Sequence, residues 1–376
     1  MPTSRPRRYR ELVLLFGLLA FASSVTGSFW VVFLFAVQGL TPAAIAALLG
    51  AAAFTASLVA MAMSRVRSLP ATPPIVGGLL CLAGMQLALA FLRGPALYAL
   101  FSILYGGYIP LFFLPWNTLV ASETRVHDRG AKLAGISLAN SVATVGAPFV
   151  GGVVAGTLGF PMLFLLGAGL LGIACLVAAA IGRASERVRL VWGPARLGRG
   201  TVTAYAAQGG IDGVMWTAIP LITFSFVQQE VQLGALFSLF ALTGGVFTVL
   251  LGLWSDRLRH RRHFVTLGAA ISVPLAAAVG VAPTLTAFTA ANGALTGSLV
   301  IAPTFVNAAV VDRLEADVGL VMQTREVILN LARGVSSSAI LVLFLAGLPI
   351  QLAVLLVAGL LPFQVAAERL RSRGGF

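Results

Sequence analysis

Two charged residues lie deep inside long apolar segments of this sequence. Asp212, in the stretch QGGIDGVMW, lies 12 residues beyond position 200, where an apolar segment begins, and this is about 18 Å along a helix. Arg333 lies 11 residues into a later apolar segment that begins at 322, or about 16 Å along it. An ionised acid at the centre of a bilayer costs roughly 2.5–3.5 kcal/mol. We therefore expect each charge to face a cavity, pair with the other or, for the acid, bind a proton.

The expected pair of Asp212 with Arg333 has two interpretations. Protonation of the acid would release the arginine and change which conformation is favoured, so the pair would act as a proton- or substrate-responsive switch. The alternative is a static structural ion pair. Residues spaced by three, four or seven positions share a helix face with these charges and are candidate substrate contacts: Gln208, Trp216, Glu326 and Asn330.

Aromatic and polar residues also recur at helical spacing in three other apolar segments. They are Trp30 in the first, Tyr105, Tyr108, Trp116 and Asn117 in another, and Asn292 and Thr296 in a third. A single aromatic residue is more often a packing residue or an interface anchor. A set on separate helices favours a cavity for an amphipathic organic ligand.

The composition indicates the element type that must position these residues. The chain is 59% hydrophobic and only 10% charged, against about 25% charged residues in soluble domains, so it reads as an all-α integral membrane protein. Its net charge of +13 comes from arginines in short gaps between apolar runs, a placement that argues against nucleic-acid binding. Cys81 and Cys175 have no metal-ligand or CxxC spacing, and we expect no metal and no cofactor.

Apolar runs of about 20 residues predict twelve membrane spans. They lie near 11–37, 42–64, 72–92, 95–122, 132–157, 161–182, 200–227, 232–255, 264–282, 284–311, 322–346 and 349–367. Nearly all of the 25 Lys and Arg residues fall in alternate gaps between the spans. We count Arg325 with the residues of one of these gaps. The positive-inside rule then places both termini in the cytoplasm, in a multi-pass protein of the cell (inner) membrane.

The gap at 183–199 divides the spans six and six. We expect an N-terminal bundle over 1–182, a cytoplasmic linker over 183–199 and a C-terminal bundle over 200–376. A shift of 192 residues places AMAMSRVR (Ala60–Arg67) on GLWSDRLR (Gly252–Arg259). Pseudo-symmetric six-helix halves are typical of secondary transporters.

The stretch GLWSDRLRHRR after the eighth span resembles the loop motif of the major facilitator superfamily, and the twelve-span layout is similar to that family's throughout the chain. The motif's gating positions match Gly252, Asp256, Arg257 and Arg261. The first-half copy is degraded, with Ala60 and Ser64 replacing the Gly and Asp, while Arg65 remains. The resemblance implies that Asp256 latches the two halves; the alternative is a turn that only fixes topology.

A second stretch, GAPFVGG in the fifth span, resembles a Gly-Pro-x-x-Gly-Gly motif of the family's proton-coupled exporters. Pro148, Gly151 and Gly152 match, while Ala147 stands where the first Gly would be. The exporter reading makes these residues a hinge. Simple close packing of small residues is the alternative.

These patterns predict a secondary active transporter of a small organic solute that works by alternating access. We expect proton-coupled export of a drug or metabolite by a monomer in the lipid bilayer. Proton-coupled uptake of a sugar or organic acid is the alternative, since pairs of an acid and a base in spans seven and eleven are familiar in the family's sugar permeases. A non-concentrative facilitator, sensor or scramblase with the same fold stays open. No HExxH, GxSxG or P-loop motif occurs in the sequence, and we do not expect an enzyme.

Overall fold

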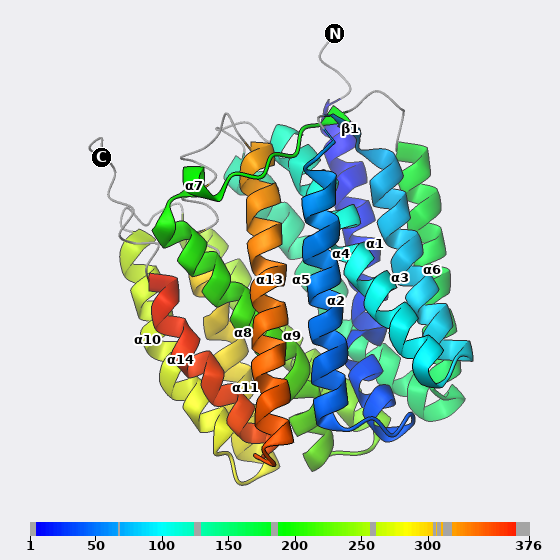
Figure 1. The fold of residues 1–376 in the computed structure, drawn as a ribbon, viewed down its shortest axis with the longest axis vertical. Helices are drawn as coiled ribbons and strands as arrows, with labels where there is room; N and C mark the ends of the chain where they lie inside the picture. Colours follow the sequence, from blue (N-terminus) through cyan, green and yellow to red (C-terminus); the bar gives the residue numbers. More distant parts are fainter. Residues whose placement is uncertain are drawn as a thin grey trace.

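The computed structural model describes residues 5–66, 68–123, 129–181, 187–255, 261–303, 306, 310 and 318–365. Long helices run roughly side by side along the long axis of the molecule (Figure 1). Their bounds are α1 Arg5–Ala36, α2 Pro42–Met63, α3 Thr72–Phe91, α4 Gly94–Glu123, α5 Arg129–Leu158, α6 Phe160–Ile181, α8 Arg199–Phe226, α9 Glu230–Ser255, α10 Arg261–Gly280, α11 Leu285–Leu299, α13 Val318–Leu345 and, after the 3-10 helix η2 Ile350–Val354, α14 Leu355–Gln364.

The expected twelve-span architecture is confirmed. Within the described residues, nine helices are long and apolar enough to cross a membrane, and two further apolar helices, Phe264–Gly280 and Ile350–Gln364, are shorter. The twelfth is α8, which spans 28 residues but carries Arg199, Gln208 and Asp212 among its apolar residues. The helix that holds the central acid is thus long enough to cross a membrane, and its composition keeps it out of the nine.

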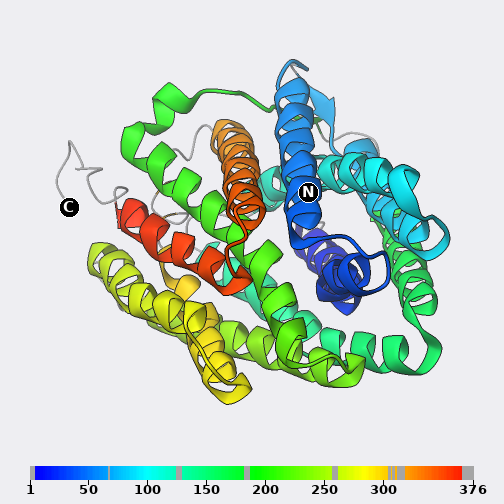
Figure 2. The same cartoon turned by 60° about the horizontal axis from the view of Figure 1, so that its bottom comes forward.

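The helices form two groups that pack against each other. In one group α1 packs on α5 and α6, and α3 on α4 and α6; in the other, α8 packs on α13 and α14, and α9 on α11. The groups meet through α5 against α9 and through α2 against α13. Figure 2 shows the two groups side by side, blue to green and green to red. The two-bundle fold predicted from the sequence is therefore confirmed.

A short strand pair, absent from the sequence prediction, holds the connection between the bundles. Strand β1 (Leu69–Pro70) pairs antiparallel with β2 (Arg187–Val188), and the guanidinium of Arg187 donates to Ser68 Oγ at 2.9 Å and to its carbonyl at 3.1 Å. Further on, the backbone N–H of Gly193, before the short helix α7 (Pro194–Leu197), donates to Thr324 Oγ1 of α13 at 3.1 Å. The connection is thus bonded to both bundles. We call this end of the molecule the linker face and the opposite end the far face (Figure 1).

At the far face the bundles touch through aromatic side chains. Phe35, near the end of α1, lies edge-on to Phe224, near the end of α8, with ring centroids 5.9 Å apart. Phe29 of α1 and Phe237 of α9 are also 5.9 Å apart. These contacts join α1 of one bundle to α8 and α9 of the other.

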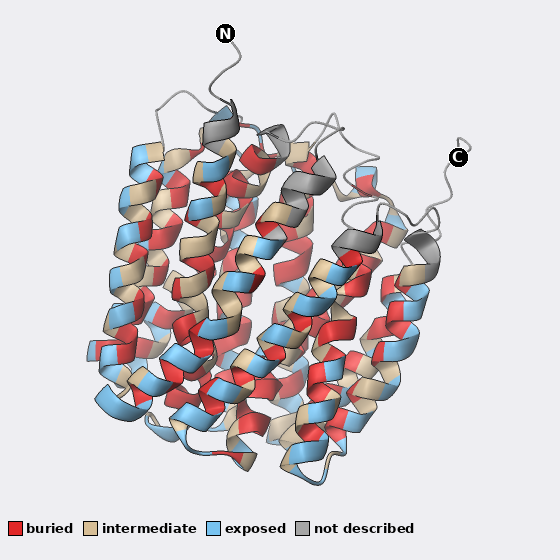
Figure 3. Ribbon diagram, turned by 180° about the vertical axis from the view of Figure 1, so that it is seen from behind, coloured by how far each residue is buried: buried red, intermediate tan, exposed pale blue. Residues whose placement is uncertain are grey.

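Large apolar side chains lie exposed on the outer surfaces of many helices, where Figure 3 shows exposed residues along their length. Leu58, Phe91, Val142 and Leu176 are each more than 60% exposed. Lipid tails are as apolar as these side chains, so such exposure carries no penalty in a bilayer. The structure is that of a multi-pass membrane protein.

Some helix ends differ from their predicted positions. Helix α1 begins at Arg5 and α13 at Val318, where the sequence analysis placed starts near 11 and 322. Polar residues next to an apolar run remain helical when backbone hydrogen bonds continue, and hydropathy does not detect this. Arg325, which its charge had assigned to a gap although the predicted span 322–346 contains it, lies inside α13.

Candidate functional site

A cavity of about 580 Å³ lies between the two bundles, within the usual size range of ligand pockets. Helices α1, α3, α4 and α5 line it from one bundle, and α8, α9, α11 and α13 line it from the other. Any change in the relative position of the bundles therefore changes the shape of this cavity.

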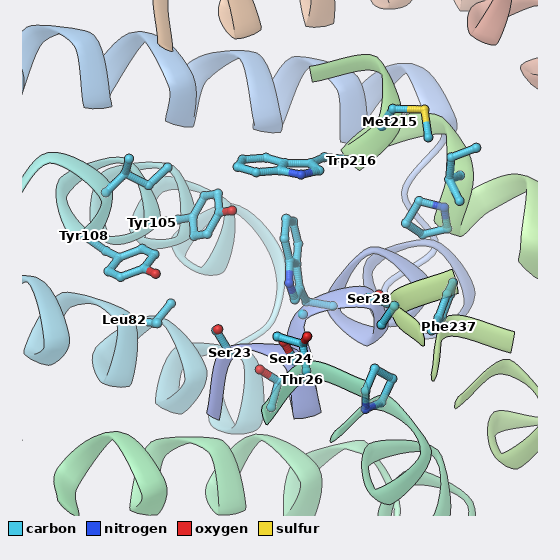
Figure 4. A pocket seen from close by; sticks show the side chains of 18 of the residues that line it. Ser23, Ser24, Thr26, Ser28, Leu82, Tyr105, Tyr108, Met215, Trp216 and Phe237 are labelled. Atoms are coloured by element: carbon cyan, nitrogen blue, oxygen red, sulfur yellow. The ribbon is translucent and has the colours of Figure 1, made fainter. Parts of the chain in front are cut away.

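One wall of the cavity is aromatic. Tyr105 and Tyr108 of α4 point their hydroxyl oxygens inward, and Trp216 of α8 lies next to Tyr105 (Figure 4). The ring centroid of Trp30 on α1 lies 5.2 Å from that of Tyr105. The sequence had placed these four residues at the site, and all four line the cavity.

The opposite wall is formed by small hydroxyl side chains on α1. Ser23, Ser24 and Thr26 lie across the pocket from Trp216 (Figure 4). Gln86 of α3, which is 1% exposed, donates from Nε2 to Thr26 Oγ1 at 2.6 Å. The cavity thus presents rings on one side and hydrogen-bonding groups on the other, which suits an amphipathic organic ligand.

Asp212 and Arg333 meet at mid-helix. Arg333 NH2 lies 2.8 Å from Asp212 Oδ2, and the side chains are 12% and 28% exposed. The guanidinium also lies over the Trp216 ring, 4.5 Å from its centroid, a favourable cation–π arrangement. Arg333 lines the cavity, whereas Asp212 is not among the described lining residues. The acid therefore reaches the cavity through its arginine.

A hydrogen-bonded chain extends from this pair along α13. Arg333 NH1 donates to Asn330 Oδ1 at 2.9 Å, and Asn330 Nδ2 donates to Glu326 Oε1 at 2.9 Å. Glu326 is 4% exposed and lines the main cavity. Asn330 is fully buried and lines a second cavity of about 20 Å³ behind Arg333. The helical spacing of these three residues had predicted a shared face, and the structure adds that Asn330 stands behind the cavity wall.

Two predicted substrate residues lie elsewhere. Trp116 stacks on Phe16, with centroids 4.3 Å apart, and its indole N–H donates to the carbonyl of Leu12 at 3.3 Å, so it packs α4 against α1. Gln208 is half-buried and is not among the described residues that line the cavity. Neither side chain is among the described lining residues, and a role of either in substrate binding stays a prediction. Asn117 does line the cavity.

Helix α11 contributes Asn292 and Thr296, as the sequence had suggested. Thr296 Oγ1 donates to the Asn292 carbonyl at 2.8 Å. Asn292 is 1% exposed, and within the described structure neither polar atom of its amide has a hydrogen-bond partner. Arg325, which sequence reasoning missed, also lines the cavity and lies 5.8 Å from the Tyr205 ring centroid. Arg325 lies eight residues before Arg333, about two helical turns, and this spacing could have indicated that it lies near the same helix face.

Of the expected motif residues, those in α5 lie at helix contacts. Pro148 lines the cavity. A Cβ on Gly151 would meet the carbonyl of Val25, and one on Gly152 would lie 2.5 Å from the carbonyl of Glu230 and 3.0 Å from the Cα of Gly234. Close packing therefore requires both glycines. 

The loop-motif residues are only partly placed. Gly252 lies in α9, Arg261 begins α10, and Arg65 is exposed in the turn after α2. Asp256 and Arg257 lie outside the described residues, so the latch remains a prediction.

Comparison with known proteins agrees with this architecture at the level of fold. No protein-family profile matches the sequence, and no curated protein matches it either. Solved structures do match, and the chain has the fold of major facilitator superfamily transporters.

Two of these structures superpose over almost the whole chain. The human organic anion transporter MFSD10 (TETRAN) has 17% identity and a TM-score of 0.66, covering 97% of this chain and 100% of that one. A variant of the E. coli fucose:proton symporter FucP has 14% identity and a TM-score of 0.67, covering 98% and 100%. At these identities the likeness establishes the fold.

Proposed function

We propose that this protein is a secondary active transporter that moves a small amphipathic organic solute by alternating access. The observation that carries the proposal is the central cavity, which is lined by both bundles and has one partner of a part-buried ion pair, Arg333, in its wall. Rocking of the bundles would expose the cavity first to one side of the membrane and then to the other. The solved structures of similar fold are named as an organic anion transporter and a fucose:proton symporter, and both names support transport.

The Asp212–Arg333 pair is proposed to couple transport to protons. It joins α8 to α13 near the middle of both helices, and protonation of Asp212 would remove one charge of the pair. The alternative is a static pair that only stabilises the C-terminal bundle. Coupling is favoured because Arg333 is also part of the cavity wall, so solute and proton would act on one group.

Export is the proposed direction, with the linker face in the cytoplasm. Arginine-rich gaps on that face and the exporter-like GAPFVGG stretch support it. Uptake by proton symport is the second candidate, supported by the acid–base pair of α8 and α13. The proposal includes two predictions from the sequence: Asp256 latches the two halves, and residues 183–199 form the cytoplasmic linker between the bundles.

The test is transport in proteoliposomes with imposed pH gradients of either sign. A panel of fluorescent amphipathic cations, anions and neutral compounds would be screened with the wild-type protein, Asp212→Asn and Glu230→Gln. Glu230→Gln is a matched control because it removes one negative charge at the start of α9, away from the described cavity lining. We expect gradient-driven flux in the wild type and control, and loss of the gradient dependence in Asp212→Asn.

The outcomes separate the candidates. Accumulation in inverted vesicles indicates export, and accumulation in right-side-out vesicles indicates uptake. Flux that ignores the gradient in the wild type points to a facilitator or scramblase, and ligand binding without flux points to a sensor. Full pH-driven flux in Asp212→Asn would remove the proton role of that residue.

A further inference from the structure

The acid that meets the cavity is Glu326, and it is joined to the Asp212–Arg333 pair by one side chain. Its Oε1 accepts from Asn330 Nδ2, and Asn330 Oδ1 in turn accepts from Arg333 NH1, each at 2.9 Å. Asn330 Nδ2 also lies 2.9 Å from the backbone carbonyl of Glu326. Glu326 lines the main cavity, while Asn330 lines only the small cavity behind it. A change at Glu326 can therefore reach Arg333 through Asn330 without any ligand touching the asparagine.

The amide of Asn330 can report the charge of Glu326 because it has one acceptor oxygen. An ionised Glu326 only accepts hydrogen bonds, so it takes Nδ2–H and leaves Oδ1 for Arg333. A protonated Glu326 carries an O–H donor, for which Oδ1 of Asn330 is the acceptor at hand. If the amide turns over to accept that proton, its NH₂ group faces Arg333, and two donors then oppose each other. The turn breaks the Asn330–Arg333 hydrogen bond and also the bond from Nδ2 to the backbone carbonyl of Glu326.

Resting on the proposed function, we propose that Asn330 is a positioning residue that relays the protonation of Glu326 to the Asp212–Arg333 pair. A proton from the aqueous phase binds a carboxylate oxygen of Glu326 and neutralises it. Asn330 reorients, and Arg333 keeps its bond to Asp212 but loses its hydrogen bond to Asn330, so its guanidinium is free to shift over the Trp216 ring. The Arg333 side chain of the pair is then no longer held against α13 by Asn330. Helix α13 is also the element that contacts α2 of the other bundle.

Other charged and titratable groups surround this chain. Helix α13 itself adds Arg325, whose guanidinium lies over Tyr205 of α8. From α4, Tyr108 lies close enough to Glu326 for an electrostatic interaction, and Tyr105 close enough to Arg333. Helix α2 contributes a neutral hydroxyl at this level, Ser57, which donates to the Val327 carbonyl at 3.3 Å. Glu326 is therefore the acid that both faces the cavity and bonds Asn330.

The test follows Trp216, because the Arg333 guanidinium lies 4.5 Å from its ring centroid. The intact protein would be labelled with 5-fluorotryptophan and titrated with acid in detergent by fluorine NMR, the Trp216 signal being assigned from its absence in Trp216→Phe. We expect the chemical shift of that signal to change with pH in the wild type and in the control Ser337→Ala. In Glu326→Gln we expect the signal to remain but its pH-dependent change to disappear. Ser337 lines the same small cavity but lies outside the hydrogen-bonded chain.

Two substitutions at Asn330 separate a relay from a structural role. Asn330→Gln keeps an amide and should retain the shift, whereas Asn330→Met has a side chain of similar length without an amide and should lose it. A shift that persists unchanged in Glu326→Gln, or in folded Asn330→Met, overturns the relay. The readout does not involve flux, so a failed relay would be distinct from a failed transport proposal.

Discussion

At the scale of single residues, two asparagines of similar burial have opposite environments. Asn330 makes hydrogen bonds with both polar atoms of its amide, while in the described structure the amide of Asn292 makes none. A buried polar group without a partner costs about 1–3 kcal/mol. Asn292 lines the cavity, so its amide is placed where a solute could bond it, and we propose it as a ligand contact.

Substitution of these asparagines by leucine should have opposite effects on stability. Asn292→Leu removes two unpaired polar atoms, so we expect a free energy of unfolding higher by about 1 kcal/mol together with weaker solute binding. Asn330→Leu leaves an Arg333 donor and a Glu326 acceptor without a partner. It should therefore lower the free energy of unfolding by about 1–3 kcal/mol. Thermal unfolding in detergent and equilibrium binding measure the two effects. Equal destabilisation by both changes would contradict this account.

The ion pair makes a second prediction at this scale. Arg333→Gln leaves Asp212 without its counter-charge, and we expect a loss on the order of 1–3 kcal/mol, less than for a fully buried pair because Asp212 is 28% exposed. The double variant with Asp212→Asn should recover part of that stability. A thermal-unfolding double-mutant cycle checks this, and additive effects would mean that the pair contributes no coupling.

Sequence reasoning predicted much of the site at this scale. The spacing of Glu326, Asn330 and Arg333 fixes one helix face whatever the exact ends of the helix, so that set was correctly grouped. It could not tell which of two acids meets the cavity, because this depends on how α8 and α13 are rotated against each other. Trp116 packs on α1, because an aromatic ring at helical spacing packs equally well towards a neighbouring helix.

At the scale of helices, the contact of α5 with α9 depends on glycine. A Cβ on Gly234 would lie 2.5 Å from the carbonyl of Pro148 and 3.0 Å from the Cα of Gly152. Backbones therefore approach closely where the bundles meet, with Ser238 Oγ accepting from the N–H of Phe149 at 2.9 Å. The GAPFVGG stretch is thus part of the interface between the bundles.

Replacement of Gly152 by alanine should separate α5 from α9. Alanine normally stabilises a helix interior by roughly 0.5–1 kcal/mol relative to glycine, and Gly146→Ala is the matched control because nothing lies within 4 Å of its added Cβ. We expect Gly152→Ala to lower the melting temperature and Gly146→Ala to leave it unchanged or raise it. Calorimetry measures the melting temperatures of both variants. An unchanged melting temperature in Gly152→Ala would show that the two backbones separate without loss of stability.

The elements themselves were largely predictable, since long apolar runs leave little choice of structure in a membrane. The exceptions share a physical cause. The β1·β2 pair has two residues in each strand, too short for any periodicity, and forms between segments far apart in the sequence. The start of the last span as the 3-10 helix η2 is likewise a local choice of hydrogen-bond pattern that composition does not reveal.

At the scale of the whole molecule, the aromatic contacts at the far face must separate if the cavity is to open there. Phe35 and Phe224 belong to different bundles, whereas Phe33 and Phe160, with ring centroids 5.5 Å apart, belong to the same one. The two pairs lie at similar separations, so they form a matched comparison for rocking of the bundles.

Cross-linking should therefore block transport only between the bundles. With Cys81 and Cys175 replaced by alanine, cysteines at 35 and 224 joined by a short bifunctional thiol reagent should abolish flux, and cleavage of the link should restore it. The same reagent on cysteines at 33 and 160 should leave flux intact. Continued flux with the first link in place would exclude a rocking motion that opens the far face.

Asp212 and Arg333 are 121 residues apart in the chain, and this separation matters during synthesis. The ribosome delivers α8 to the membrane long before α13 exists, so the acid enters the lipid with no counter-charge of its own. A helix of such composition is poorly retained by itself, and its final placement depends on the arrival of a much later segment. The C-terminal half of the protein is therefore completed as a unit, and a nascent chain that stops short of α13 would hold α8 only loosely in the bilayer.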